Sequence, residues 1–157
     1  LADVINAGCR DGELDVRGIS HRGYFASITD FKSYHDANMD LIDYKTATDL
    51  FHDNWPIYTR TNNSCPTHYF DTANVSNSVI SNGSMIEGTV ENSIVGRGCT
   101  IKKGAVIKNC VVLADCTIGE NVHIENLVVD KHAKITHAKE IIRPADEPGY
   151  IKRNDTL

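Results

Sequence analysis

The sequence predicts a mainly β protein built around a parallel β-helix, a coil of short strands that gains one turn per repeat. A six-residue phrase occurs four times in the second half of the chain, with copies that begin at Val75, Val90, Ile107 and Ile124. A separate series of isoleucines keeps the same three intervals, of which the first is slightly shorter than the other two. A period of about 17 residues, divided by aliphatic residues about every six, is what a three-sided solenoid of parallel strands requires.

The phrase reads aliphatic, any residue, asparagine, any residue, aliphatic, aliphatic. Its asparagines are Asn77, Asn92, Asn109 and Asn126, and the isoleucine series is Ile86, Ile101, Ile118 and Ile135. Small residues precede each isoleucine by two positions: Ser84, Cys99, Cys116 and Ala133. We expect the aliphatic residues to stack inside and the small residues to fit the tight vertices. Asparagine tolerates a left-handed turn and bonds to its copy in the next coil.

An antiparallel meander with Asn/Gly turns is the alternative fold. It requires a hairpin dipeptide at each turn, and only Asn82-Gly83 offers one. The six-residue spacing of aliphatic residues also continues through positions where a hairpin turn would interrupt it. The solenoid is therefore the preferred prediction, with about four coils.

The first part of the chain has weaker signals. Residues 1–22 are expected to be irregular, with a short strand at Leu14-Asp-Val16, and a start at Leu1 suggests a segment of a longer protein. A helix is predicted over 27–42, where Ser27 and Asp30 have the spacing of a capping box.

A second helix is predicted over 46–52, ended by Trp55-Pro56, because proline keeps the preceding residue extended. Trp55 is expected to be a packing anchor, and residues 57–73 an extended arm. After the last coil, Ile141 and Ile142 are expected to fold over the open end, and the acidic stretch 145–149 to be loosely ordered.

Composition excludes several functions. The chain has 16 basic and 21 acidic residues, a formal charge of -5, and no basic cluster beyond Lys102-Lys103, so nucleic acid is a poor partner. No apolar run approaches the ~20 residues of a membrane span, and no signal peptide is recognisable. Five cysteines without a CxxC pair predict reduced thiols and no zinc site. We expect a soluble cytoplasmic protein.

Three stretches resemble bacterial glucose-1-phosphate adenylyltransferases. Gly23 to Leu41 is similar to the end of their nucleotidyltransferase domain, Gly-Tyr-Trp-x-Asp-[Val/Ile]-Gly-Thr and then Ala-Asn-[Met/Leu]-Asp-Leu. Asn54 to Thr59 resembles their Trp-Pro-Ile-x-Thr phrase, and Cys65 to Phe70 their Pro-Pro-Ala-Lys-Phe phrase. The resemblance covers residues 23 to 138, and it implies a left-handed β-helix of the hexapeptide-repeat type.

The resemblance divides the chain into four segments. They are a remnant of the α/β nucleotidyltransferase domain (1–45), a helix with a linker arm (46–73), the β-helix (74–140) and a capping tail (141–157).

Departures from the family pattern bear on activity. The resemblance implies that Tyr24, Phe25 and Ser27 occupy substrate-side positions, and Ser27 stands where the family has an aspartate that helps to hold Mg²⁺. A serine hydroxyl cannot replace the charge of that carboxylate. No glycine-rich phosphate loop is present, and that half of the enzyme is expected upstream. We therefore expect no catalytic residue, metal or cofactor in this chain, whereas Mg²⁺ is implied only for catalytic family members.

The leading hypothesis is a regulatory or assembly subunit of glycogen biosynthesis, inactive alone. The resemblance implies that its β-helix binds a catalytic homologous subunit, itself, or both. Whether the full-length protein is itself an active adenylyltransferase is left open. An anionic sugar-phosphate effector is a further candidate ligand, because charged side chains bind phosphate well. The residues that could bind it are Arg60, His68, Arg97, Lys102 and Lys103. The simpler explanation of these residues is scattered surface charge.

Two other function classes remain. A hexapeptide-repeat acyltransferase would use a histidine as general base, and His123, His132 and His137 are the candidates, although solvated surface histidines are the plainer reading. The tight repeat spacing leaves no room for the protruding loop that such enzymes commonly need. The third possibility is a purely structural assembly domain whose open coil needs a cap or a partner.

Overall fold

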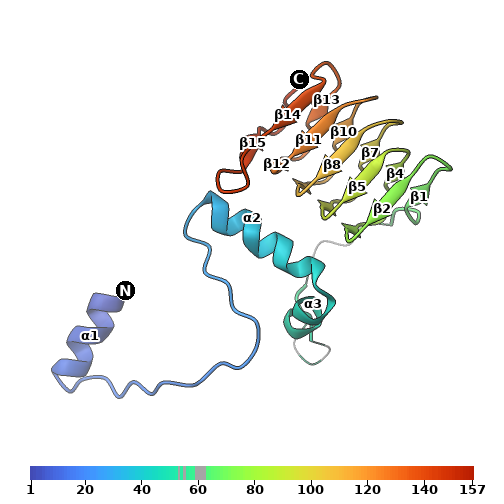
Figure 1. Ribbon diagram of the computed structural model, residues 1–157. Coiled ribbons are helices and arrows are strands. Elements are labelled where there is room, and N and C mark those ends of the chain that lie inside the picture. The colour runs from blue at the N-terminus through green and yellow to red at the C-terminus, as the bar shows by residue number, and fades with distance from the viewer. Residues whose placement is uncertain (53, 55, 59–62) are drawn as a thin grey trace.

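The computed structural model describes residues 1–157 except 53, 55 and 59–62. In this part of the chain three α-helices and a 3-10 turn precede a parallel β-helix made of three five-stranded sheets (Figure 1). Neighbouring strands of a sheet lie one turn apart, so five strands span four turns. The predicted fold class is confirmed. No helix among the described residues is long and apolar enough to cross a membrane.

The helical elements are α1 (Ala2–Arg10), α2 (Phe31–Met39), the 3-10 turn η1 (Asp40–Ile42) and α3 (Tyr44–Leu50). The first sheet contains β1 (His68–Tyr69), β4 (Met85–Ile86), β7 (Thr100–Ile101), β10 (Thr117–Ile118) and β13 (Lys134–Ile135). The second contains β2 (Asn74–Ser76), β5 (Thr89–Glu91), β8 (Val106–Lys108), β11 (His123–Glu125) and β14 (Glu140–Ile142). The third contains β3 (Val79–Ile80), β6 (Ile94–Val95), β9 (Val111–Val112), β12 (Leu127–Val129) and β15 (Gly149–Ile151).

Columns of aliphatic side chains fill the interior. In the first sheet the column is Ile86, Ile101, Ile118 and Ile135, paired in register and all 0% exposed. The small residues that precede them by two positions, Ser84, Cys99, Cys116 and Ala133, are buried as well. Full burial of an aliphatic side chain contributes about 1.5–3 kcal/mol, so these columns are the main source of stability.

The asparagine of each phrase occupies a corner between the second and third sheets. Asn77, Asn92, Asn109 and Asn126 have φ angles of 41, 45, 49 and 56°. This left-handed conformation costs asparagine less than most residues. Asn77 Nδ2 donates to Asn92 Oδ1 at 2.8 Å, and Asn92 Nδ2 donates to Asn109 Oδ1 at 2.6 Å. Asn126 Nδ2 instead donates to the Arg143 carbonyl at 2.6 Å.

The shorter first interval of the repeat, from Val75 to Val90, arises at one corner. Two residues join β4 to β5, whereas four join β7 to β8. At the short corner a Cβ on Gly88 would lie 2.5 Å from the Ala105 carbonyl oxygen and 2.8 Å from that of Lys102. Glycine is therefore needed because the backbones of successive coils approach closely there.

The buried thiols lie inside the solenoid. Cys99, Cys110 and Cys116 are buried, Cys9 and Cys65 are exposed, and all five are free. Burial raises the pKa of the Cys110 thiol to about 12. Contact with Cys116, together with burial, raises the pKa of Cys99. Cys99 and Cys110 therefore act as small apolar residues rather than as reactive thiols.

The helical segment differs from the expectation in three places. Residues 1–22 are not all irregular, because α1 forms with Asp3 in its first turn and Arg10 in its last, which suits the helix dipole. The expected strand at 14–16 has no regular structure. The second predicted helix, at 46–52, is α3 and starts two residues earlier, where Asp43 accepts a bond from the Thr46 amide.

The main helix also starts later than the predicted 27–42. It begins after Asp30, which forms a capping box with Ser33, so the expected box of Ser27 and Asp30 is wrong. Both pairs have the same three-residue spacing, and the sequence alone did not separate them. The expected anchor Trp55 lies outside the described residues.

The solenoid is longer than 74–140 at both ends. β1 already belongs to the first sheet, so the expected arm enters the solenoid at His68. The expected tail adds β14 and β15 to the other two sheets. Of the two residues expected to cap the coil, Ile141 packs against the core and Ile142 is 45% exposed. The stretch expected to be loosely ordered is a turn in which the Glu147 amide donates to the Pro144 carbonyl.

The two ends of the solenoid are finished differently. After β15 the chain turns back, and Leu157 packs against the core while its amide donates to the Lys134 carbonyl at 2.9 Å. Ile151, at the same end of the solenoid, is only 8% exposed. At the other end Tyr69 takes the column position next to Ile86 and is 51% exposed. In the part of the chain that the structure describes, Leu157 covers the core at the C-terminal end, whereas the core at the N-terminal end stays partly exposed at Tyr69.

Candidate functional site: a helix between an apolar pocket and the solenoid

An apolar column runs along the outside of the third sheet. Its strands carry two adjacent apolar residues at most positions, and successive side chains point to opposite faces, so one of each pair faces outward. The outward members are Val79, Ile94, Val111, Val128 and Tyr150. Val111 and Val128 are 1% and 2% exposed although neither belongs to the internal core, whereas Val79 is 42% exposed. Something outside the solenoid therefore covers the middle of this column.

Helix α2 provides this cover. It contacts β9, which carries Val111, and it lies alongside the solenoid (Figure 1). At its first turn the Phe31 ring meets the edge of the Tyr150 ring with centroids 5.7 Å apart. Tyr150 is held in turn by a hydrogen bond from its hydroxyl to Asp130 at 2.7 Å, which lowers the pKa of Asp130.

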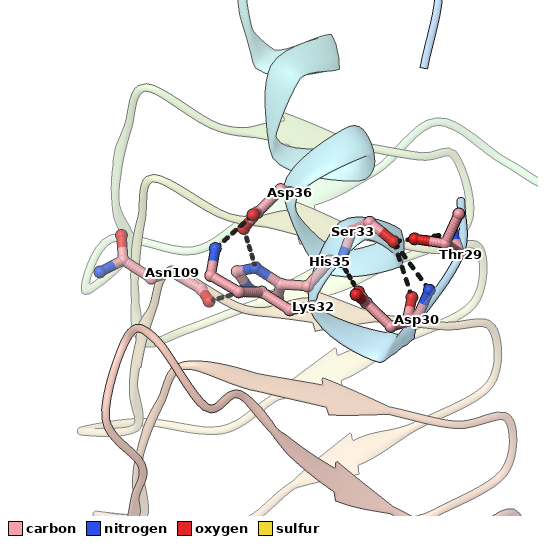
Figure 2. Close-up of polar contacts among 7 residues, drawn as sticks. All are labelled: Thr29, Asp30, Lys32, Ser33, His35, Asp36 and Asn109. Carbon is pink, nitrogen blue, oxygen red and sulfur yellow. Dashed lines mark hydrogen bonds and ion pairs between the residues drawn. The ribbon is translucent and has the colours of Figure 1, made fainter. Parts of the chain in front are cut away.

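A buried histidine fixes the helix to one corner of the solenoid. His35 is 6% exposed, and its Nε2 donates to the Asn109 carbonyl at 2.8 Å (Figure 2). Its Nδ1 lies 3.5 Å from Asp36 Oδ1, and Asp36 pairs with Lys32 one turn earlier. The hydrogen bond from Lys32 lowers the pKa of Asp36. Helix α2 is thus held to the solenoid in two ways. It makes a polar contact with the corner at Asn109 and an apolar contact with the outward residues of the third sheet.

The start of α2 is fixed by its own side chains. The Asp30 carboxylate accepts from the Ser33 amide at 2.7 Å, and the Ser33 hydroxyl accepts from the Asp30 and Thr29 amides at 3.0 Å each (Figure 2). The bond from the Ser33 amide lowers the pKa of Asp30. This cap sets where the extended segment before α2 turns into the helix.

The other face of α2 lines a hollow of about 370 Å³. With 3.6 residues per turn, positions two apart are separated by roughly 200° around a helix axis. The face that carries Ala37 is therefore opposite the face that carries His35. The lining residues are Tyr24, Phe25, Ala26, Ile28, Ala37, Asn38, Leu41 and Leu50.

The pocket contains one tyrosine with a fixed hydroxyl. The Tyr24 hydroxyl donates to Asp40 Oδ2 at 3.0 Å, and partial burial and this bond raise the pKa of Tyr24. The bond ties the segment before α2 to the turn η1 that follows it. Helix α2 thus lies between this pocket and the solenoid.

The three residues that the resemblance places on the substrate side are only partly brought together. Tyr24 and Phe25 line the pocket, with Phe25 78% exposed, and Ser27 is exposed beside it. Ser27 offers a metal ion a neutral hydroxyl rather than a carboxylate, and Mg²⁺ prefers anionic oxygen ligands. In the described part of the chain, no group of three or more His, Cys, Asp or Glu is arranged to hold a metal.

The candidate general bases lie apart on the solenoid. His123 is on β11, with its ring nitrogens 3.5 Å from Glu140 and 3.7 Å from Glu125. His132 occupies a corner with φ of 62°, 3.7 Å from Asp115. His137 follows β13 and is exposed. None of the three lines either pocket described for this chain.

The candidate effector-binding cations also come from different corners. Arg97 lies between β6 and β7, at the corner of the third and first sheets. Lys102 and Lys103 lie between β7 and β8, at the corner of the first and second sheets, and Lys102 is 4.0 Å from Glu87. His68 lies on β1 against Phe70. Arg60 is outside the described residues.

The junction residues were missed by the sequence reasoning, although part of the signal was there. Val111-Val112 and Val128-Val129 place two aliphatics side by side on a strand, which requires an apolar environment on both faces. His35 had no such signal, because a histidine on a helix is more often exposed.

Comparison with known proteins matches a family model described as GlmU-like, C-terminal hexapeptide, over residues 66–147. The glycogen biosynthesis protein GlgD of Bacillus subtilis is 36% identical over 140 residues, 89% of this chain and 41% of the relative. Glucose-1-phosphate adenylyltransferase of Geobacillus stearothermophilus is 42% identical over 86 residues (55% and 22%), and that of Bacillus mycoides 36% over 122 residues (78% and 32%). The chain thus spans between about a fifth and two fifths of these relatives. The resemblance carried by its sequence phrases is confirmed.

Proposed function

Since this chain belongs to the family of GlmU-like C-terminal hexapeptide domains, we propose that it is the solenoid part of an adenylyltransferase-like protein of glycogen biosynthesis. Its role there is regulation and assembly rather than catalysis. Relatives that carry the names glucose-1-phosphate adenylyltransferase and glycogen biosynthesis protein support the coarser assignment. A cytoplasmic location belongs to the same proposal.

The observation that carries the finer proposal is the serine at position 27. A displacement on a nucleotide phosphate needs a metal to neutralise developing charge, and a hydroxyl in place of a carboxylate removes one anionic ligand. Phe25 beside it stands where the resembling family has a tryptophan that contacts the sugar. The relative named GlgD also matches a larger share of this chain than the adenylyltransferases above.

In such a subunit, helix α2 would couple the solenoid to the pocket on its other face. Helix α2 holds the solenoid through His35 and lines the pocket through Ala37 and Asn38. A ligand or subunit that shifts the corner at Asn109 moves the helix, and the helix moves one wall of the pocket. Coupling of this kind requires an element that both sites contact, and α2 meets that requirement.

The test is synthesis of ADP-glucose from ATP and glucose 1-phosphate. The protein that contains this chain is assayed alone and mixed with a catalytic glucose-1-phosphate adenylyltransferase from the same cells. We expect no measurable synthesis alone, and a changed rate or a changed response to sugar phosphates in the mixture. Robust synthesis by the isolated protein would overturn the regulatory role and favour a catalytic subunit.

A matched pair of variants refines the test. In the same protein, Ser27→Asp restores the carboxylate and Ser27→Ala removes the hydroxyl. We expect Ser27→Ala to leave the mixture unchanged, because the hydroxyl has no catalytic task. A large loss of the mixture's activity in Ser27→Ala would contradict the proposal.

A further inference from the structure

The buried histidine that holds α2 to the solenoid keeps one ring nitrogen without a hydrogen bond. His35 Nε2 faces the Asn109 carbonyl at 2.8 Å, and a carbonyl oxygen only accepts, so Nε2 carries the proton of the neutral ring (Figure 2). Nδ1 is then an acceptor. It is buried, and the described part of the chain gives it no hydrogen-bond partner. Buried polar atoms without a partner are uncommon in folded proteins, so this nitrogen requires an explanation.

The group that faces Nδ1 is the carboxylate of the next residue. Asp36 Oδ1 lies 3.5 Å from Nδ1 and is also an acceptor, so no hydrogen joins the two atoms while the ring is neutral. A second proton on the ring would turn Nδ1 into a donor to this carboxylate and keep the bond to Asn109. The charge of Asp36 would also offset part of the cost of a buried cation.

The charges of the helix side keep this carboxylate ionised. The hydrogen bond from Lys32 lowers the pKa of Asp36. The bond to Asp36, together with the charges of Asp30 and Asp146, raises the pKa of Lys32. Asp30 caps α2, and Asp146 lies in the turn between β14 and β15. These four groups therefore keep their charges in the pH range in which histidines titrate.

The charged groups of the solenoid near this contact are also paired. Lys108 precedes the corner asparagine and lies 3.2 Å from Glu91, its partner in register one coil earlier. Burial raises the pKa of Cys110, the next residue, to about 12, so its thiol stays neutral. At the first turn of α2, the bond from Tyr150 lowers the pKa of Asp130. Of the titratable groups around the junction named so far, the imidazole is the one that ordinarily changes charge near neutral pH.

We propose that protonation of His35 strengthens the contact between α2 and the solenoid, so that the junction responds to pH. The bond from the protonated ring to the Asn109 carbonyl is charge-assisted, and such bonds are roughly twice as strong as neutral ones. A base that gains a partner in the folded state stabilises that state when it is protonated. The contribution is therefore present in mild acid and is lost as the pH rises.

The effect would reach the pocket on the other face of α2. Ala37 and Asn38 line this pocket, and they follow directly after the two residues that exchange the proton's charge. A firmer contact with the solenoid holds this wall of the pocket more firmly. The inference goes beyond the proposed function and does not depend on it, because it concerns the docking of a helix within this chain and not the synthesis of ADP-glucose.

The experiment measures hydrogen exchange of the full chain from about pH 7.5 to about pH 5.5, the range in which histidines titrate. Each rate is divided by that of an unstructured peptide at the same pH, which gives the protection of each amide. We expect the protection of α2 to rise about threefold or more as the pH falls, while that of β8 and β9 stays constant. Constant or falling protection of α2 in the wild-type chain overturns the inference without any variant.

Two variants assign the effect to its residues. His35→Gln keeps an amide that can donate to the Asn109 carbonyl but takes up no proton, so the rise should disappear. Asp36→Asn removes the anion beside the ring, so the rise should shrink. His137→Gln is the matched control, because it makes the same change at an exposed position of the solenoid and should keep the full rise. A rise that persists in His35→Gln, is undiminished in Asp36→Asn or is lost in His137→Gln assigns the dependence to another group and overturns the inference.

Discussion

The solenoid and the helical segment before it are held together by different means. In the solenoid the middle coils bury their aliphatic columns completely and pair their backbones with the coils on both sides. Helix α1 has no buried residue, and α2 has one, His35. The segment depends on a few contacts with a neighbour that is already folded. Damage to the solenoid should therefore disrupt both regions, whereas damage to the junction should release the helix and leave the coils intact.

The largest effect is expected from a charge in the inner column. Ile118 is 0% exposed in the middle of the first sheet, so Ile118→Asp buries an unpaired carboxylate and should cost about 4 kcal/mol or more. Thermal melting should show a large loss of stability in both regions. Lys103→Asp, a change to the same residue at an exposed site, should melt within a few degrees of wild type. Equal melting of the two variants would place the columns elsewhere.

A smaller loss is expected from the asparagine column. Asn92→Ala removes the amide bonds to Asn77 and Asn109 and leaves a non-glycine residue at φ 45°, which together should cost about 2–3 kcal/mol. Asn92→Gly removes the same bonds but tolerates the backbone angle, so it should cost less in chemical denaturation. If glycine is as damaging as alanine, the column acts through its bonds alone.

The junction should respond locally. His35→Ala leaves the Asn109 carbonyl without its donor and opens a cavity under α2, at about 1–3 kcal/mol of docking free energy. Hydrogen exchange should accelerate in α2 and α3, while β7, β8 and β9 keep their protection. His137→Ala, at an exposed position on the solenoid, is the control. Loss of protection throughout the coils would mean that the two regions fold as one unit.

The smallest effect on the stability of the junction is expected from lowering the pH. Bonds from Lys32 and Ser33 lower the pKa values of Asp36 and Asp30 from 3.8. Carboxylates with lowered folded pKa values stabilise above the unfolded value and lose that contribution as the pH falls through the folded value. Exchange in α2 should therefore quicken below about pH 4 while the solenoid stays protected. Asp36→Asn should flatten part of this dependence, and an unchanged profile would argue against the Lys32 pair.

Much of the solenoid could be predicted because its signals repeat. The spacing of Ile101, Ile118 and Ile135 predicts the length of a coil, the register of the first sheet and the burial of these side chains. Each further copy of the repeat supports the same prediction. The ends had no such support, because β1, β14 and β15 depart from the phrase although they pair with the neighbouring strands of their sheets.

The site was less predictable for a related reason. The position of Ser27 was visible through resemblance, but the contact between His35 and Asn109 joins residues 74 positions apart and follows no local pattern. The outer cover over Val111 and Val128 was implied by paired aliphatics, yet nothing in the sequence identified α2 as the covering element. Helix α1 was missed because Asn6 and Gly8 favour turns.

The equal register of successive coils has a consequence for how this molecule could change in length. Each repeat unit between Ile101 and Ile135 meets the units above and below through the same pairings. A tandem duplication of one unit would therefore fit between its neighbours without altering either terminus. The solenoid would then lengthen by about 4.8 Å, the distance between neighbouring strands, with each duplicated repeat.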